Sequence, residues 1–373
     1  MIRVGLLKGD YDAAGGPETL LAALIPELRA AGVEPVVIAL VRDHSHRVIG
    51  MLGSDPSISM RIISWSGLAS APLVATRLAK VLREENCQII HTHDMRCALA
   101  TFLAKPFVQL PWLAHVHGWL GDTHHGVHAF YEKIDKRLVR WADAVAVGSR
   151  NAEAEVAGLG IRRIEFVPNA VPIPTLDCDG SATAPIRSQL GIAPGEFLIG
   201  SVGRLQYGKG HDLFIRAVAR LRNEQQNVRA LVVGTGPAAG DLKSLAVSLG
   251  LGDTLHFTGF VDTVQPYVRA MDVVAVPSRK ESLPLTVLEA MALERPVAAA
   301  AVGDLPDVIR DGESGIIVPP EDVAALAAAL RRLMADEPLR LRLGKAARQR
   351  VISTYSIPAM SLRLADVYAR MLG

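Results

Sequence analysis

Short apolar runs alternate with longer amphipathic segments along most of the chain. A short apolar run is typical of a buried strand, and a longer segment with apolar residues on one side is typical of a helix. In the first half, strands are predicted up to residue 8 and over residues 36–40, 87–91, 112–115, 144–147 and 164–167. Helices are predicted over residues 19–31, 72–85 and 131–141. This alternation indicates a parallel sheet with helices on both faces.

The alternation stops near residue 168 and resumes near residue 195. The segment between is rich in Pro, Gly, Asp and Ser, which is typical of an interdomain linker. Beyond it, strands are predicted over residues 197–202, 229–233, 255–257, 273–276, 297–301 and 316–318, and helices over 211–223, 239–249, 284–293, 323–334, 338–353 and 357–372. We therefore expect an α/β protein with two Rossmann-like doubly wound domains facing each other across a cleft. The carboxyl ends of both sets of strands would form a ligand site there.

Composition narrows the function classes. A length of 373 residues fits two domains, and 50% hydrophobic with 21% charged residues excludes a mainly disordered chain. A net charge of +2 argues against a dedicated nucleic-acid binder. The three cysteines, Cys87, Cys97 and Cys178, argue against a disulfide framework and fit a reducing cytoplasm. The first apolar run is too short for a signal peptide, and no apolar stretch is long enough to predict a transmembrane helix.

Gly15-Gly16 follows the first predicted strand and opens a predicted helix. Glycines let the backbone approach a ligand closely, and a helix N-terminus favours an anion. A plain strand-to-helix turn explains the pair equally well. The pattern G-x-G-x-x-G of dinucleotide-binding folds does not fit here, which disfavours a nicotinamide cofactor.

A second candidate loop follows the first strand of the second predicted domain. It contains Gly203-Arg204 and Lys209-Gly210. An arginine and a lysine in one glycine-bounded loop are able to converge on a phosphate. A solvated basic loop is the alternative interpretation. The spacing does not match the Walker A pattern of nucleotide triphosphatases.

The segment over residues 277–291 is the most informative. Pro284 suits the first turn of a helix, and the free N–H groups of Leu285 and Thr286 would then point out of the helix start and favour a phosphate. Glu281 precedes this helix and Glu289 lies in its second turn. Two carboxylates on either side of a phosphate match a sugar nucleotide, which has ribose, diphosphate and sugar in that order. An ordinary capped helix with an exposed Glu289 is the alternative.

Seven of the eleven histidines lie between His91 and His128. His91 and His93 are two positions apart, as are His115 and His117, so each pair points to one face of a strand end. Such pairs resemble half of a metal site, as in metal hydrolases built on barrels, but the second half of the chain offers no further ligand set. Packing or surface histidines are the other interpretation. His117, at a predicted strand end, is the best candidate for a functional imidazole.

Taken in order, these motifs make the chain resemble the retaining glycosyltransferases of the GT-B group, family 4. The resemblance rests on Gly15-Gly16 with Glu18, His117-Gly118, Pro168-Asn169, Gly203-Arg204 with Lys209-Gly210, Gly234-Thr235-Gly236-Pro237, Glu281 and Glu289 followed by Ala290-Met291, and Asp311-Gly312 with Gly315.

The resemblance implies an acceptor-binding domain over residues 1–175 and a nucleotide-sugar-binding domain over residues 190–355, with the last helix, 357–373, packing back on the first. It implies that Arg204 and Lys209 neutralise the donor diphosphate without a metal. Glu289 would hold the ribose hydroxyls, Glu281 the sugar hydroxyls, and the backbone at residues 285–286 the distal phosphate. His117 would lie beside the transferred sugar.

We therefore assign the catalytic residues as His117, Arg204, Lys209 and Glu281. We assign the donor-binding residues as Gly15, Gly16, Gly203, Gly236, Ser282, Leu283, Leu285, Thr286 and Glu289. No resident cofactor and no metal are expected.

Three positions depart from the family pattern. Ser282 replaces the usual glycine after the first glutamate, and Leu293-Glu294-Arg295-Pro296 lacks the usual small residue before the next strand. Gly303-Asp304-Leu305-Pro306-Asp307 replaces the usual Gly-Gly-x-Pro-Glu, and the carboxylate of Asp304 would repel a phosphate. We therefore do not expect this loop to contact the diphosphate. No charged residue of the expected site is lost.

The expected function is transfer of a hexose, with retention of configuration, from a UDP- or GDP-sugar to a glycan, lipid-linked or small-molecule acceptor. The expected setting is polysaccharide biosynthesis in the cytoplasm. Two alternatives remain at this point: a sugar-nucleotide epimerase of the same architecture, and a non-catalytic sugar-nucleotide-binding protein. An epimerase would convert the donor without an acceptor, and a non-catalytic binder would release no nucleoside diphosphate.

A basic stretch in the first predicted domain bears on the partner. It consists of Lys133, Lys136, Arg137 and Arg140. Such a stretch is usually a solvated helix face, and the alternative is peripheral contact with an anionic membrane at the inner face.

Overall fold

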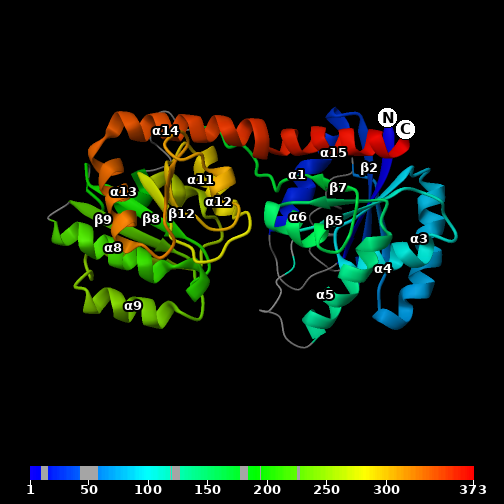
Figure 1. Cartoon of the computed structure of the whole chain (residues 1–373), viewed down its shortest axis with the longest axis horizontal. Coiled ribbons are helices and arrows are strands. Elements are labelled where there is room, and N and C mark those ends of the chain that lie inside the picture. Colours follow the sequence, from blue (N-terminus) through cyan, green and yellow to red (C-terminus); the bar gives the residue numbers. More distant parts are fainter. Residues whose placement is uncertain are drawn as a thin grey trace. The chain divides into compact units, whose positions relative to one another are not determined.

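The computed structural model describes residues 1–9, 16–42, 58–117, 119, 127–176, 184–193, 195–224 and 227–373. The chain divides into two units (Figure 1). Unit 1 comprises Met1–Pro172 together with Ile357–Gly373, and unit 2 comprises Ile173–Ser356. The last helix therefore belongs to the same unit as the first strand.

Unit 1 is built on a seven-stranded parallel sheet with the order β3-β2-β1-β4-β5-β6-β7. Its strands are β1 Ile2–Gly9, β2 Val33–Val41, β3 Met60–Ser64, β4 Ile89–Thr92, β5 Trp112–Val116, β6 Ala144–Val147 and β7 Ile164–Phe166. The central strands are buried on both faces, which explains their continuous apolar sequence. The chain leaves β1 toward β2 on one side and returns to β4 on the other, so a topological switch point lies between β1 and β4.

Helices cover both faces of this sheet. They are α1 Gly16–Ala30, α3 Ala71–Glu84, α4 Met95–Ala104, α5 Val127–Leu138, α6 Arg150–Ala157 and α15 Ile357–Leu372, with the short helices η1 Leu68–Ser70 and η3 Val139–Trp141. One core cluster joins α1 and α15 to Leu6 and Ile89, and a second joins α3 and α4 to Leu7 and Ile90. Alternate residues of one strand thus face opposite layers.

Unit 2 repeats the design with six parallel strands in the order β10-β9-β8-β11-β12-β13. The strands are β8 Phe197–Val202, β9 Val228–Val233, β10 Leu255–Gly259, β11 Val273–Val276, β12 Val297–Ala300 and β13 Ile316–Val318. The helices are α7 Ala184–Gln189, α8 His211–Asn223, α9 Ala239–Ser248, α10 Gln265–Ala270, α11 Leu285–Ala292, α12 Leu305–Val308, α13 Val323–Ala335 and α14 Glu337–Arg350, with η4 Tyr207–Lys209 and the π-turn η5 Val351–Tyr355. Here the switch point lies between β8 and β11.

The apolar pattern located most of these elements to within a few residues, but it did not predict β3 or the helices α4, α6, α7, α10 and α12. β3 is a half-buried edge strand with a short apolar run. α4 and α6 begin at side-chain caps: Asp94 accepts a hydrogen bond from the N–H of Cys97, and Ser149 accepts one from the N–H of Ala152. These caps are readable in the sequence and mark both helix starts.

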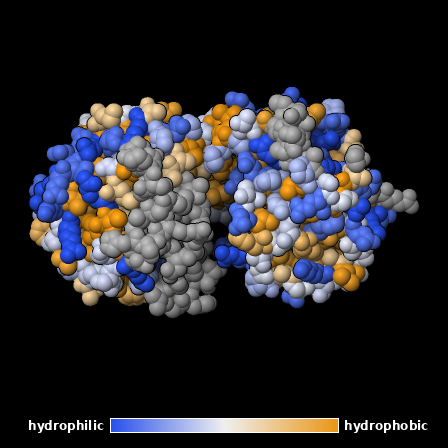
Figure 2. Space-filling model, turned by 180° about the vertical axis from the view of Figure 1, so that it is seen from behind, coloured by the Kyte–Doolittle hydropathy of each residue, from blue (hydrophilic) through white to orange (hydrophobic). Residues whose placement is uncertain are grey.

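None of the described helices is both long and apolar enough to cross a membrane. On the face shown in Figure 2, hydrophobic residues are interspersed with hydrophilic ones.

Candidate functional site

The two loops that follow β8 and β11 are joined backbone to backbone. Gly210 has a φ of +65°, and a Cβ there would lie 2.0 Å from the carbonyl oxygen of Pro277. The N–H of Arg279 donates to the carbonyl of Gly208 at 2.8 Å. Only glycine permits this approach at residue 210, because any side chain would collide with the β11 loop. The switch point of unit 2 is therefore a single rigid structure made of both loops.

Arg279 reinforces this junction from the side. Its guanidinium binds both carboxylate oxygens of Asp212 at 2.7 and 2.8 Å, contacts Glu321 at 2.6 Å and lies 4.0 Å from the ring of Tyr207. Burial by itself raises the pKa of Asp212, but the hydrogen bonds and charge of Arg279 outweigh it and hold that pKa below its usual value. Arg279 was not predicted as a site residue from the sequence. Its place directly after a predicted strand, within the segment over residues 277–291, could have indicated it.

Lys209 and Glu281 meet at this junction. Lys209 Nζ lies 2.7 and 2.8 Å from the two oxygens of Glu281, and Ser278 Oγ donates to the same carboxylate at 2.7 Å. The side chain of Glu281 is only 6% exposed. Arg204 lies exposed at the start of the β8 loop, and its guanidinium has no ion-pair partner in the described part of the chain. Of the three residues of unit 2 that we expect to be catalytic, Lys209 and Glu281 therefore form an ion pair, and Arg204 is an exposed charge without an ion-pair partner among the described residues.

The start of α11 lies immediately beyond this ion pair in sequence. Pro284 caps the helix without a side-chain hydrogen bond. Among the described residues, the N–H groups of Leu285 and Thr286 have no acceptor. Leu283 is buried, and Ser282 is exposed with its carbonyl accepting from the N–H of Asp304 at 3.4 Å. Two unsatisfied backbone donors at a helix N-terminus are suited to an anion.

Glu289 lies on α11 and is half-buried. No described residue forms a hydrogen bond or ion pair with its carboxylate, and burial raises its pKa. An unpartnered, partly desolvated carboxylate is costly in the free protein and is suited to accept hydrogen bonds from a ligand.

Glycines also explain how the β8 and β9 loops pack. A Cβ on Gly234 would lie 2.0 Å from the carbonyl oxygen of Gly203, and one on Gly236 would lie 2.3 Å from that of Leu205. Beneath Gly203 lies the buried ring of His211, hydrogen-bonded to Ser201 at 3.1 Å, and burial lowers its pKa to about 4. Gly234 and Gly236 are thus required for close packing of these loops, whereas Gly203 is favoured by its φ of +153° rather than by lack of space. Gly16 opens α1 in unit 1, whereas Gly15 lies outside the described residues.

In unit 1, four histidines form a ladder on one face of the sheet. The register places His91 of β4 beside Leu6 of β1 and Leu113 of β5, so His93 falls beside His115. Each strand then contributes two histidines two positions apart, and all four project from the same face. Ring centroids of neighbours are 4.3–5.5 Å apart. We call this set, His91, His93, His115 and His117, the histidine ladder.

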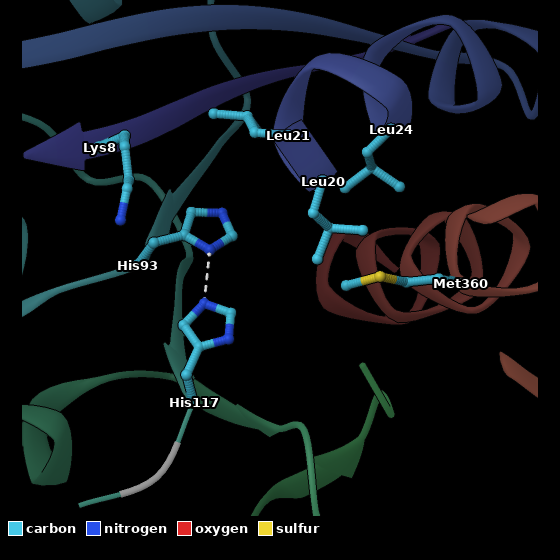
Figure 3. A pocket seen from close by; sticks show the side chains of 7 residues that line it. All are labelled: Lys8, Leu20, Leu21, Leu24, His93, His117 and Met360. Carbon is cyan, nitrogen blue, oxygen red and sulfur yellow. Dashed lines mark hydrogen bonds between the residues drawn. The ribbon is translucent and has the colours of Figure 1, made fainter. Parts of the chain in front are cut away.

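The ladder runs from the core to the carboxyl edge of the sheet. His91 Nδ1 lies 2.7 Å from the hydroxyl of Tyr368 on α15, and His93 Nδ1 lies 3.3 Å from His117 Nε2. Burial lowers the pKa of His91 to about 3 and that of His117 to about 4, so both rings are neutral at pH 7. Figure 3 shows His93 and His117 beside the side chain of Lys8, in a pocket otherwise lined by leucines of α1 and by Met360 of α15.

Comparison with known proteins decides the family. A family model described as glycosyl transferases group 1 matches residues 183–350, and one described as Glycosyltransferase Family 4 matches residues 14–173. A D-inositol 3-phosphate glycosyltransferase of Corynebacterium efficiens is 34% identical over 95% of this chain and 90% of its own length. A 2-deoxystreptamine glucosyltransferase of Streptomyces kanamyceticus is 30% identical over 89% of this chain and 91% of its own. The chain belongs to glycosyltransferase family 4.

The structural neighbours agree on the fold of this family-4 glycosyltransferase. A glycosyltransferase from Rickettsia africae has a TM-score of 0.82 over 100% of this chain and 98% of its own, at 18% identity. Anabaena HepE in complex with UDP has a TM-score of 0.82 over 99% of this chain and 100% of its own, at 19% identity. Both likenesses confirm the expected GT-B fold. The protein is a retaining, nucleotide-sugar-dependent glycosyltransferase, and one of its relatives is named a glucosyltransferase.

The burial of Glu289 leads to a stability prediction for this glycosyltransferase. A raised pKa means that the folded protein disfavours the ionised carboxylate of Glu289. The loss of folding stability from this ionisation is complete above the folded pKa and vanishes below the unfolded pKa of 4.5. We expect Glu289→Gln to stabilise the donor-free protein by on the order of 1 kcal/mol at pH 8. This gain should shrink as the pH falls to 5. Urea unfolding at both pH values measures it, and equal or reversed differences would contradict it.

Proposed function

We propose that unit 2 of this family-4 glycosyltransferase binds the nucleoside diphosphate of a UDP- or GDP-sugar and that unit 1 binds the acceptor. The observation that carries the proposal is the joined pair of loops at the β8–β11 switch point. This junction presents a basic pair, two unsatisfied N–H groups of α11 and the unpartnered Glu289 on consecutive elements. A sugar nucleotide needs that combination of positive charge, anion cradle and ribose acceptor.

In this proposal, Arg204 and Lys209 drive the chemistry. Breaking the bond between the sugar and the diphosphate builds negative charge on the leaving phosphate oxygens. Fixed cations beside those oxygens stabilise the transition state more than the ground state. Because this pair supplies the positive charge, we propose that transfer needs no metal. Lys209 shares its charge between Glu281 and the incoming phosphate.

The two glutamates are proposed to serve opposite ends of the donor. Glu289 accepts hydrogen bonds from the ribose hydroxyls, and Glu281 accepts them from the sugar hydroxyls. Lys209 and Ser278 already orient the Glu281 carboxylate, which supports a binding role rather than that of a covalent nucleophile. Gly203, Gly236, Ser282 and Leu283 shape the loops around the diphosphate. In unit 1, His117 is proposed to lie beside the transferred sugar.

For the acceptor we propose a small polyhydroxylated ring. Two relatives that are at least 30% identical over most of this chain carry names that specify D-inositol 3-phosphate and 2-deoxystreptamine, and both compounds are hydroxylated cyclohexanes. A glycan acceptor, with a role in polysaccharide biosynthesis, and a lipid-linked acceptor are the alternatives. Release of nucleoside diphosphate from UDP- and GDP-sugars, measured with each acceptor class, decides between them. Release only with glycans or lipid-linked sugars would overturn the ring-acceptor proposal.

We further propose that the protein works in the cytoplasm at an anionic membrane face. Cys87 and Cys97 are buried free thiols, which suits a reducing compartment. Lys136 pairs with Glu132 at 2.7 Å, which leaves Lys133, Arg137 and Arg140 on the basic stretch. Phe130 and Trp141 on the same segment are 55% and 67% exposed. Basic groups beside exposed aromatic rings are suited to an anionic lipid surface.

The basic pair gives the first functional prediction. Arg204→Ala and Lys209→Ala should each lower turnover by about 100-fold or more, because each removes a charge that stabilises the leaving group. Steady-state kinetics measure the effect, with Lys280→Ala, an exposed neighbour in the β11 loop, as the control. Arg204→Ala should leave the melting temperature unchanged. Lys209→Ala should cost about 1–2 kcal/mol, because it strips a buried carboxylate of its cation. Near-normal turnover in both variants would rule out the basic pair.

The glutamates give the sharpest prediction. Glu289→Gln should weaken the binding of nucleoside diphosphate by about tenfold to a hundredfold, because a hydrogen bond to a charged group contributes about 1.5–3 kcal/mol. Glu281→Gln should leave that affinity nearly intact and lower sugar transfer. Calorimetry with UDP and GDP on both variants provides the measurement. Equal weakening, or weakening by Glu281→Gln alone, would show that the ribose and sugar ends are reversed.

Membrane contact is tested by flotation with vesicles. The protein should float with vesicles that contain anionic lipid and not with neutral vesicles, and raised salt should release it. The double variant Lys133→Glu, Arg140→Glu should lose binding. The double variant Lys243→Glu, Lys345→Glu, at exposed positions of α9 and α14, serves as a charge-matched control. Equal binding by both variants would assign the basic stretch to solvent.

A further inference from the structure

The histidine ladder leaves an unusual number of polar atoms unsatisfied. Within the described part of the chain, four buried ring nitrogens have no hydrogen-bond partner: Nε2 of His91, Nε2 of His93, and both nitrogens of His115. His91 is fully buried and His115 is only 4% exposed. Each orphaned polar atom in a dry interior costs stability, and the proposed transfer reaction uses none of the three residues.

The three histidine rings also lie together. One ring nitrogen from each of His91, His93 and His115 lies within 4.8 Å of the others. Ligands of a tetrahedral zinc ion with bonds of about 2.0–2.1 Å are about 3.3 Å apart. The χ2 torsion of histidine has a broad energy minimum, so the proposed site requires a rotation of these stacked rings that brings the three nitrogens onto one ion.

Neighbouring groups prepare two of the rings for this role. With the proton of His91 on Nδ1, that N–H donates to the hydroxyl of Tyr368 at 2.7 Å and leaves a lone pair on Nε2. In the same way, a proton on Nδ1 of His93 is donated to Nε2 of His117 at 3.3 Å. Metal-binding histidines characteristically use the second nitrogen for such a hydrogen bond, which fixes the tautomer.

We propose that His91, His93 and His115 form a binding site for a divalent transition-metal ion of the zinc class, with a fourth coordination position toward the pocket of Lys8 and His117. Three neutral imidazoles suit Zn²⁺, Co²⁺, Ni²⁺ or Cu²⁺ and do not suit Mg²⁺ or Ca²⁺, which prefer oxygen ligands. The ammonium group of Lys8 opposes a cation here, and the carboxylate of Asp94 offsets it only in part, at His117.

The site is separate from the transfer chemistry proposed for unit 2. The basic pair needs no metal, so a metal in the ladder is a structural or regulatory ligand. It would act on the reaction only through the hydrogen bond between His93 and His117, and that single step rests on the proposed role of His117.

Metal titration tests the site on the full chain after removal of metal with EDTA. We expect one tight Zn²⁺ equivalent in competition with a chromophoric chelator, and Co²⁺ should give the visible absorption of a four-coordinate site. His115→Gln should weaken the binding of Zn²⁺ by at least about 100-fold. Tyr368→Phe should weaken it by about 10-fold, because this substitution removes the hydroxyl that orients His91. His256→Gln on β10 is the matched control and should bind Zn²⁺ like the unaltered protein.

Two further readouts keep the outcomes distinct. Affinity for nucleoside diphosphate, a property proposed for unit 2, should be unchanged in every variant. A cooperative unfolding transition of unit 1 like that of the unaltered protein shows that each variant folds. If His115→Gln does not fold, Tyr368→Phe and His93→Gln decide the question. A tight equivalent that survives these substitutions, or no tight equivalent in the unaltered protein, overturns the metal site. Loss of turnover in EDTA with recovery on Zn²⁺ would instead overturn metal-independent transfer and leave the metal site standing.

Discussion

The candidate donor site depends on one close backbone contact, between Gly210 and the carbonyl of Pro277. This contact holds the loop after β8 against the loop after β11 at the topological switch point of unit 2, where the strand order reverses. Without that contact, Lys209 and Glu281 would lie on separate mobile loops, and holding them 2.7 Å apart would cost conformational entropy. Arg279 adds a second clamp through Asp212, so the charged groups are oriented before any donor arrives. Preorganisation of this kind is what makes electrostatic catalysis effective.

The buried polar side chains of the two candidate sites differ in how many of their hydrogen bonds are satisfied. In the candidate site of unit 2, the nearly buried Glu281 is satisfied by a cation and a hydroxyl, whereas the carboxylate of Glu289 has no partner among the described residues. In unit 1, the histidine ladder is neutral and largely unsatisfied. Unsatisfied groups in a stable interior indicate that something other than folding stability retains them. We propose a ribose as the partner of Glu289 and a metal ion as the partner of the ladder.

Most of the architecture followed from local pattern. Strand and helix segments alternate because apolar runs and amphipathic segments do, and this periodicity is a property of consecutive residues. The motifs at residues 203–210 and 277–289 were assigned to strand ends for the same reason, and they lie there. Short elements with weak apolar character, such as β3, were not predicted, because an edge strand needs only a few buried residues and so has no long apolar run.

The sequence by itself therefore determined the fold class, the family and the neighbourhoods from which the charged residues come. Tertiary structure alone decided which of those residues touch. Lys209 pairs with Glu281 across 72 positions, and Tyr368 reaches His91 across 277. The ladder exists because the register of β4 against β5 sets His93 beside His115, whereas each strand's own spacing only placed two histidines on one face. Register and long-range packing arise from the simultaneous fit of distant segments, and no local pattern in one chain records that fit.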